Sequence, residues 1–131
     1  FKALLISLPI GILIALVLLI NEFPDYLADK KVGKRTLVVT LGKPGAVVLY
    51  HILLAGAYLI ILFLMLFRFL PLYSFIVFLS LPLAIKAFVV SKRDFDKIYE
   101  LLPANASTIG LHSVIGGLLG VSFLLDRMFI N

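Results

Sequence analysis

The class of fold is decided by the first twenty residues, which read FKALLISLPIGILIALVLLI (residues 1–20). Only Lys2 and Ser7 in this run are polar, and a helix of roughly 20 apolar residues is long enough to cross the hydrocarbon layer of a bilayer. Three further runs give predicted spans at 45–67, 72–90 and 104–125. Because a lipid-exposed backbone must satisfy its own hydrogen bonds, the sequence predicts an all-α fold: a polytopic transmembrane helical bundle with four spans.

The composition also indicates a membrane protein. Of 131 residues, 63% are hydrophobic and only 15% are charged, which is too apolar for an ordinary soluble domain of this length. The chain has no cysteine, so a disulfide framework and a thiolate metal site are excluded. It begins at Phe1 inside an apolar run, with neither an initiator Met nor a signal-peptide pattern. We therefore expect residues 1–131 to be a single membrane domain that forms the C-terminal part of a longer chain.

The basic residues fall mainly in the connections after the first and third predicted spans. Cytoplasmic loops are enriched in Lys and Arg, so both connections are predicted to face the cytoplasm in a multi-pass protein of the cell membrane. The excess of 12 bases over 7 acids follows from this topology, and no nucleic-acid partner is expected. The bases are Lys30, Lys31, Lys34, Arg35 and Lys43 in the first of these connections, and Lys92, Arg93 and Lys97 in the second.

Prolines and glycines predict local features of the spans. Pro9 and Gly11 predict a bend in the first span, and Pro82 predicts one in the third. The carbonyls that a proline frees need a hydrogen-bond donor from a neighbour. Gly116 and Gly120 form a small-xxx-small pattern in the fourth span, which favours close helix packing over a ligand-binding role.

Polar residues are concentrated in the stretch NEFPDYLADKKVGKRTL (residues 21–37). Asn21, Asp25 and Asp29 recur every four residues, so on a helix they project from one face. Mg²⁺ is usually held by one or two carboxylates and completed by waters and substrate phosphates. The spacing therefore predicts half of a metal–diphosphate site. The alternative is a solvated loop whose acids lie at the start of a helix opened by Pro24.

Bases follow the acids directly. Lys30, Lys34 and Arg35 are candidates for binding the diphosphate oxygens that a metal leaves free. Arg can bind them in a bidentate way, and Lys acts as a point charge. The alternative is that these bases set the topology and contact lipid headgroups, and it applies most to Lys31 and Lys43.

The spacing N-x-x-x-D-x-x-x-D-x-x-x-G-K-x-T-L over residues 21–37 resembles the second aspartate-rich motif of the UbiA superfamily of intramembrane aromatic prenyltransferases. It is closest to the branch that prenylates 1,4-dihydroxy-2-naphthoate on the way to menaquinone. Residues 105–119, with Thr108 and His112, also resemble the last helix of that branch. The resemblance covers the last four helices of a nine-helix fold.

The resemblance implies Mg²⁺-dependent transfer of a prenyl group from an isoprenyl diphosphate to an aromatic acceptor in the membrane. It makes Asp25 and Asp29 the catalytic, metal-coordinating pair and Asn21 their leading polar ligand. It assigns Lys34 and Arg35 to the leaving diphosphate. A basic residue of some family members is replaced here by proline at position 24, so one phosphate contact is either absent or supplied by Lys30.

The first aspartate-rich motif of the family, N-D-x-x-D-x-x-x-D, does not occur in the sequence. The resemblance therefore implies that the N-terminal half of the same protein completes the site, and that this chain alone is inactive. The second basic connection, over 92–100, is either a lid over the site or a solvated connector. The alternative functions are a non-catalytic helical bundle, such as a transporter segment or assembly subunit, and a family member with a non-aromatic lipid acceptor.

Overall fold

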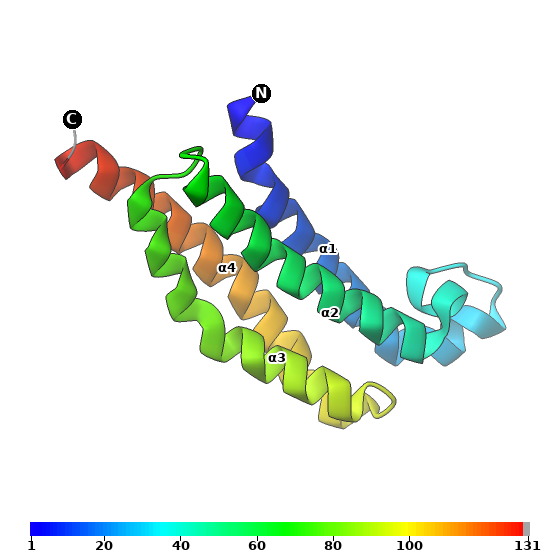
Figure 1. Cartoon of the computed structure of the whole chain (residues 1–131). Coiled ribbons are helices and arrows are strands. Elements are labelled where there is room, and N and C mark those ends of the chain that lie inside the picture. Colours follow the sequence, from blue (N-terminus) through cyan, green and yellow to red (C-terminus); the bar gives the residue numbers. More distant parts are fainter. Residues whose placement is uncertain (130–131) are drawn as a thin grey trace.

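The computed structural model describes residues 1–129, and within them every regular element is helical (Figure 1). The order is α1 (Lys2–Lys31), α2 (Leu37–Leu66), the 3₁₀ helix η1 (Leu72–Ser80), α3 (Leu81–Asp94) and α4 (Ile98–Phe129). Four helical segments are long and apolar enough to cross a membrane: α1, α2, η1 together with α3, and α4, with 30, 30, 23 and 32 residues. The predicted all-α bundle of four spans is confirmed.

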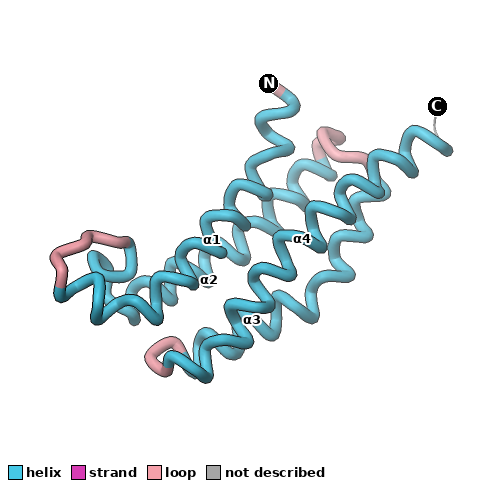
Figure 2. Tube along the Cα trace, turned by 180° about the vertical axis from the view of Figure 1, so that it is seen from behind, coloured by secondary structure: helices cyan, strands magenta, loops and turns pink. Residues whose placement is uncertain are grey.

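The long helices run side by side, and each is antiparallel to the helix before it (Figures 1 and 2). The chain start, the connection between α2 and η1 and the end of α4 lie at one end of the bundle. The connection between α1 and α2 and that between α3 and α4 lie at the other end. The two basic connections are therefore on the same side of the bundle, as their charges predicted.

The boundaries of the first two helices differ from the prediction. Helix α1 continues to Lys31, eleven residues beyond the predicted end at position 20, and Pro24 lies inside it. Pro24 therefore does not open a helix, and that part of the alternative is wrong. Helix α2 begins after Thr36, whose hydroxyl accepts a hydrogen bond from the Val39 amide at 3.2 Å. A non-helical residue, Gly42 at φ 70° and ψ 157°, separates this short start from the spanning part.

The core contains buried residues from all four spanning segments. Leucines of α1 and α4 are buried there, and buried hydroxyls join the helices across it. Tyr50 of α2 lies 2.7 Å from Thr108 of α4, and Ser74 of η1 lies 2.9 Å from Ser122 of α4 (oxygen to oxygen). Such bonds satisfy polar groups that the bilayer cannot. The first of these bonds joins α2 to α4, and the second joins η1 to α4.

The glycine face of α4 does not pack closely on another helix within the described part of the chain. A Cβ atom added at Gly116 or Gly120 would meet no heavy atom within 4 Å, so the predicted close packing is wrong for residues 1–129. The first turns of α1, which contain Pro9 and Gly11, lean away from the line of the rest of the helix (Figures 1 and 2), in agreement with the predicted bend. Pro82 lies in the first turn of α3, where the 3₁₀ helix becomes an α-helix.

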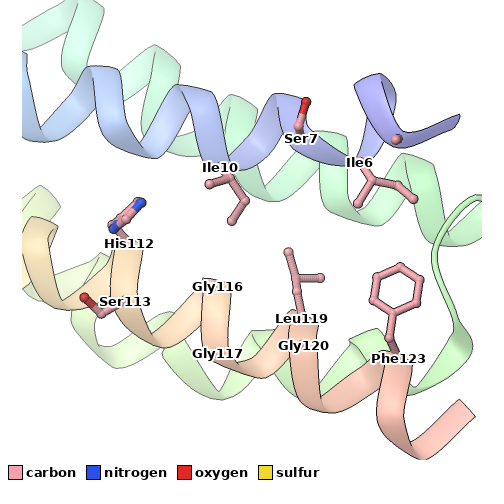
Figure 3. Close-up of a pocket in the computed structure, with 11 residues that line it drawn as sticks. Ile6, Ser7, Ile10, His112, Ser113, Gly116, Gly117, Leu119, Gly120 and Phe123 are labelled. Carbon is pink, nitrogen blue, oxygen red and sulfur yellow. The ribbon is translucent and has the colours of Figure 1, made fainter. Parts of the chain in front are cut away.

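A groove of about 610 Å³ opens between the start of α1 and the glycine face of α4 (Figure 3). Figure 3 shows Ile10 of α1 and Leu119 and Phe123 of α4 pointing into the space between the two helices. His112 also lines this groove, and it makes no hydrogen bond to any described residue. Ser7 and Ser113 line it as well, and the remaining lining residues are apolar or glycine.

Candidate metal and diphosphate site

The predicted metal ligands lie on the last three turns of α1. Asn21, Asp25 and Asp29 belong to one continuous helix, so successive members are about 6 Å apart along its axis and share a face. Asn21 and Asp25 are exposed, whereas Asp29 is buried with 8% of its surface exposed. The structure therefore forms the predicted stripe, with its deepest carboxylate nearest the loop to α2.

Asp29 is paired with Lys34 across the turn that ends α1. The Lys34 ammonium donates to both carboxylate oxygens of Asp29 at 3.2 Å, and the Lys34 amide donates to the Asp29 carbonyl at 2.9 Å. Gly33 makes this turn possible because it adopts φ +76°, a backbone angle that is unfavourable for residues with a Cβ atom. The sequence predicted Asp29 for the metal and Lys34 for the diphosphate, and the structure brings the two into direct contact.

The other predicted residues remain open to solvent. Asp25 makes no hydrogen bond or ion pair within residues 1–129, so its carboxylate can accept a ligand. Lys30 is exposed, with its ammonium 5.7 Å from the centre of the Tyr26 ring, a cation–π distance. Arg35 is exposed in the turn before α2 and has no ion-pair partner in the part of the chain that the structure describes.

Glu22 fixes the start of α2 against α1. One of its carboxylate oxygens accepts a hydrogen bond from the Val38 amide at 3.2 Å. A carboxylate is favoured at this position because the first amides of a helix lack partners and carry partial positive charge. Through this bond Glu22 ties the start of α2, which follows the loop with Lys34 and Arg35, to α1.

Asn105 lies on α4, which packs against α1, and its side chain reaches the stripe. Its side-chain nitrogen donates to the Asn21 side-chain oxygen at 2.9 Å and lies 3.5 Å from the Ile20 carbonyl. Asn105 is 8% exposed, and its own side-chain oxygen is buried with no hydrogen-bond partner in residues 1–129. Sequence reasoning missed this contact, although an asparagine inside an apolar span is itself a signal of a functional position.

The second basic connection contacts the start of α2. The Lys43 ammonium lies 3.0 Å from an Asp96 carboxylate oxygen and 5.6 Å from the centre of the Tyr26 ring. Within the second connection, Asp94 accepts from Arg93 at 2.7 Å and from Lys97 at 3.2 Å. The Lys43–Asp96 ion pair joins the second connection to the start of α2, where the connection can serve either as the lid or as the connector that the sequence left open.

The chemistry of the donors fits Mg²⁺ as part of a site. An amide oxygen and two carboxylates are hard oxygen ligands, and Mg²⁺ needs only one or two carboxylates when waters and phosphates complete its octahedron. Residues 1–129 contain no group of three or more His, Cys, Asp or Glu side chains that could hold a metal ion by themselves. The stripe can therefore contribute some of the ligands of a metal–diphosphate site.

Comparison with known proteins gives two matches. The model of the UbiA prenyltransferase family matches residues 1–121. The chain is 34% identical over 128 residues to a protein of Bacillus subtilis (strain 168) described as 1,4-dihydroxy-2-naphthoate octaprenyltransferase, covering 95% of this chain and 40% of that relative. The chain thus spans about two fifths of the length of that relative. No solved structure matches it significantly.

Proposed function

The chain belongs to the UbiA prenyltransferase family, and from this premise we propose that it supplies one half of a Mg²⁺-dependent active site for prenyl transfer within the membrane. The donor would be an isoprenyl diphosphate and the acceptor an aromatic ring. The motif at 21–37 predicted the family, and that prediction is confirmed. The observation that supports the proposal is the stripe of oxygen donors on α1. Asp25 in this stripe has no partner within residues 1–129, and basic residues follow the stripe in the last turn of α1 and in the turn after it.

Asp25 and Asp29, together with Asn21, would hold the ion, whose chemistry is to offset the charge that develops on the leaving diphosphate. Lys34 and Arg35 would contact the remaining phosphate oxygens, and Lys30 is near enough in the last turn of α1 to add a third cation. The Lys34 side chain is 61% exposed, so its ammonium can turn from Asp29 to a phosphate.

The reaction is then a substitution at an allylic carbon. The carbon–oxygen bond breaks, and its electron pair stays on the diphosphate. A ring carbon of the acceptor forms the new carbon–carbon bond and afterwards loses a proton. The cationic carbon must be kept from water. The largely apolar groove between α1 and α4 lies farther along α1 and offers a surface for the prenyl chain. Its nearest lining residue on α1 is Ile10, which is eleven residues, or about 16 Å along the helix, from Asn21.

The remaining ligands would come from a segment equivalent to the part of the relative that this chain does not cover. We therefore take the assembled protein to be this chain together with the segment that carries the first aspartate-rich motif. The basic end of the bundle would face the cytoplasm. The relative's naphthoate acceptor favours a dihydroxynaphthoate for this chain, and hence a role in menaquinone biosynthesis.

The test is substitution of Asp25 by Asn in the assembled protein in detergent. Mg²⁺-dependent transfer of a labelled prenyl group is expected to be lost, while thermal unfolding stays unchanged because Asp25 is exposed. The matched control is Glu100→Gln, which neutralises an exposed acid in the first turn of α4 at the same end of the bundle. Full activity of Asp25→Asn would contradict the proposal.

The competing function is a non-catalytic bundle whose acidic stripe contacts headgroups or a partner. It predicts that a prenyl diphosphate does not raise the unfolding temperature of the assembled protein in the presence of Mg²⁺. A rise that depends on both the diphosphate and Mg²⁺, and that disappears in Asp25→Asn, would exclude this function.

A further inference from the structure

We infer that Asn105 of α4 is a positioning residue, which orients the side-chain oxygen of Asn21 toward the metal. The inference rests on the proposed function, because it assigns Asn21 to the metal site. It starts from a contact between two residues 84 positions apart in the chain, the 2.9 Å hydrogen bond from the Asn105 amide nitrogen to the Asn21 oxygen.

The contact has its origin in Pro24. In an α-helix the carbonyl of residue 20 accepts a hydrogen bond from the amide of residue 24, but proline has no amide hydrogen. The Ile20 carbonyl in the middle of α1 is therefore left without its helical donor. Ile20 is fully buried, and an unpaired carbonyl in an apolar environment is costly. The Asn105 nitrogen lies 3.5 Å from this carbonyl, at the long end of the range for a hydrogen bond.

The freed carbonyl decides how the Asn105 amide is turned. Its nitrogen lies between two acceptors, the Ile20 carbonyl and the Asn21 oxygen. If the amide were reversed, an oxygen would face the Ile20 carbonyl, and the two would repel each other. With the nitrogen on this side, Asn21 must present its oxygen rather than its nitrogen to Asn105. One lone pair of that oxygen remains available for a metal ion.

The arrangement is retained although it leaves a buried polar atom unsatisfied. The Asn105 side-chain oxygen has no hydrogen-bond partner among the described residues. A leucine of similar volume would pack at this position without that cost. Leucine, however, could donate neither to the Asn21 oxygen nor to the Ile20 carbonyl, so the asparagine is explained by these two contacts with α1 rather than by apolar packing.

The first experiment measures Mn²⁺, as a probe for Mg²⁺, by the electron paramagnetic resonance signal of the free ion in the assembled protein. Asn105→Leu is expected to raise the Mn²⁺ dissociation constant about tenfold, the lower end of the range for residues that orient a metal ligand. The matched control is Thr108→Val, one turn along the same helix, which also removes a buried hydrogen bond between helices but has no contact with Asn21. Its Mn²⁺ dissociation constant should stay within about threefold of the wild type.

Asn105→Leu also leaves the Ile20 carbonyl unpaired, which lowers stability. The second variant removes this complication: Pro24→Ala restores an amide hydrogen opposite that carbonyl. The double variant Pro24→Ala/Asn105→Leu should unfold at the same temperature as Pro24→Ala alone and still bind Mn²⁺ about tenfold more weakly than it. If the double variant binds Mn²⁺ as tightly as Pro24→Ala, Asn105 is structural only and the inference is overturned.

Asp25→Asn separates this inference from the proposed function. If Asp25→Asn weakens Mn²⁺ binding and the double variant does not, the metal site stands and the positioning role fails. If Asp25→Asn leaves the Mn²⁺ dissociation constant unchanged, the proposed metal site fails, and the inference about Asn105 fails with it.

Discussion

Lys34 is expected to oppose metal binding when no diphosphate is present. Its ammonium lies 3.2 Å from both oxygens of Asp29, so a cation that approaches this carboxylate meets a positive charge already in place. Replacing Lys34 by Met leaves an unbranched side chain that is one atom shorter and removes the charge. We therefore expect Lys34→Met to tighten the binding of a divalent cation alone and to weaken the binding of a diphosphate.

The size of the effect follows from the geometry. Two unit charges about 4 Å apart interact by roughly 1 kcal/mol in water and about 4 kcal/mol near a protein surface of low effective dielectric. The Lys34 side chain is 61% exposed and that of Asp29 is 11% exposed, so solvent screens the ammonium, and the lower figure applies. A change of about 1 kcal/mol corresponds to roughly a fivefold lower Mn²⁺ dissociation constant. Loss of a charged hydrogen bond should weaken diphosphate binding by roughly tenfold.

The assay is Mn²⁺ titration of the assembled protein followed by paramagnetic resonance, first without and then with inorganic pyrophosphate. Lys31→Met is the matched control, because Lys31 is exposed in the last turn of α1 and makes no ion pair within residues 1–129. It changes the net charge by the same amount. Raising the salt concentration should shrink the difference between the two variants. Weaker Mn²⁺ binding by Lys34→Met in the absence of pyrophosphate would refute the reasoning.

Two further predictions concern glycines. Gly116→Leu should fold normally, since an added side chain at position 116 points into open space. In a transfer assay it should lower transfer from a long prenyl diphosphate more than transfer from a short one. Equal loss for both donors would argue against the groove as the site of the prenyl chain. Gly33→Ala should lower the free energy of unfolding by about 1 kcal/mol, because Gly33 has φ +76°. It should also weaken pyrophosphate binding by displacing Lys34. Gly11→Ala, at an open helical position, is the control in both cases, and an unfolding temperature for Gly33→Ala equal to that of the wild type would contradict the second prediction.

The fold was largely predictable from the sequence because a bilayer imposes strong limits. Four apolar runs of about the right length can only be four spanning helices, and the positions of the bases correctly placed two connections at the same end. The ends of the helices were less predictable. The first predicted span ended at Ile20, where the apolar residues stop, but Glu, Asp and Lys are compatible with helix in water, and α1 continues for three more turns.

Of the candidate site, the sequence predicted which residues share a helix face, but not their partners on other parts of the fold. A spacing of four placed Asn21, Asp25 and Asp29 on one face, and the structure bears this out. The partners of these residues depend on how helices meet, which a periodic pattern does not contain. The pairing of Asp29 with Lys34 follows from a left-handed glycine in the turn. The small-xxx-small pattern at Gly116 and Gly120 predicts close packing only if another helix runs beside it, and the bent start of α1 leaves that face open.

Pro24 shows how the local effect of a proline is compensated elsewhere in the fold. The family resemblance implied that proline at this position removes a phosphate contact, which stays a prediction. In the structure Pro24 removes the amide hydrogen that Ile20 would have used, and the carbonyl it frees lies within reach of Asn105 on α4. Because the same amide nitrogen also holds Asn21, the proline makes the orientation of a proposed metal ligand depend on the position of α4. Any movement of α4 relative to α1, including one caused by a prenyl chain that enters the groove between them, would therefore change the orientation of the Asn21 side chain.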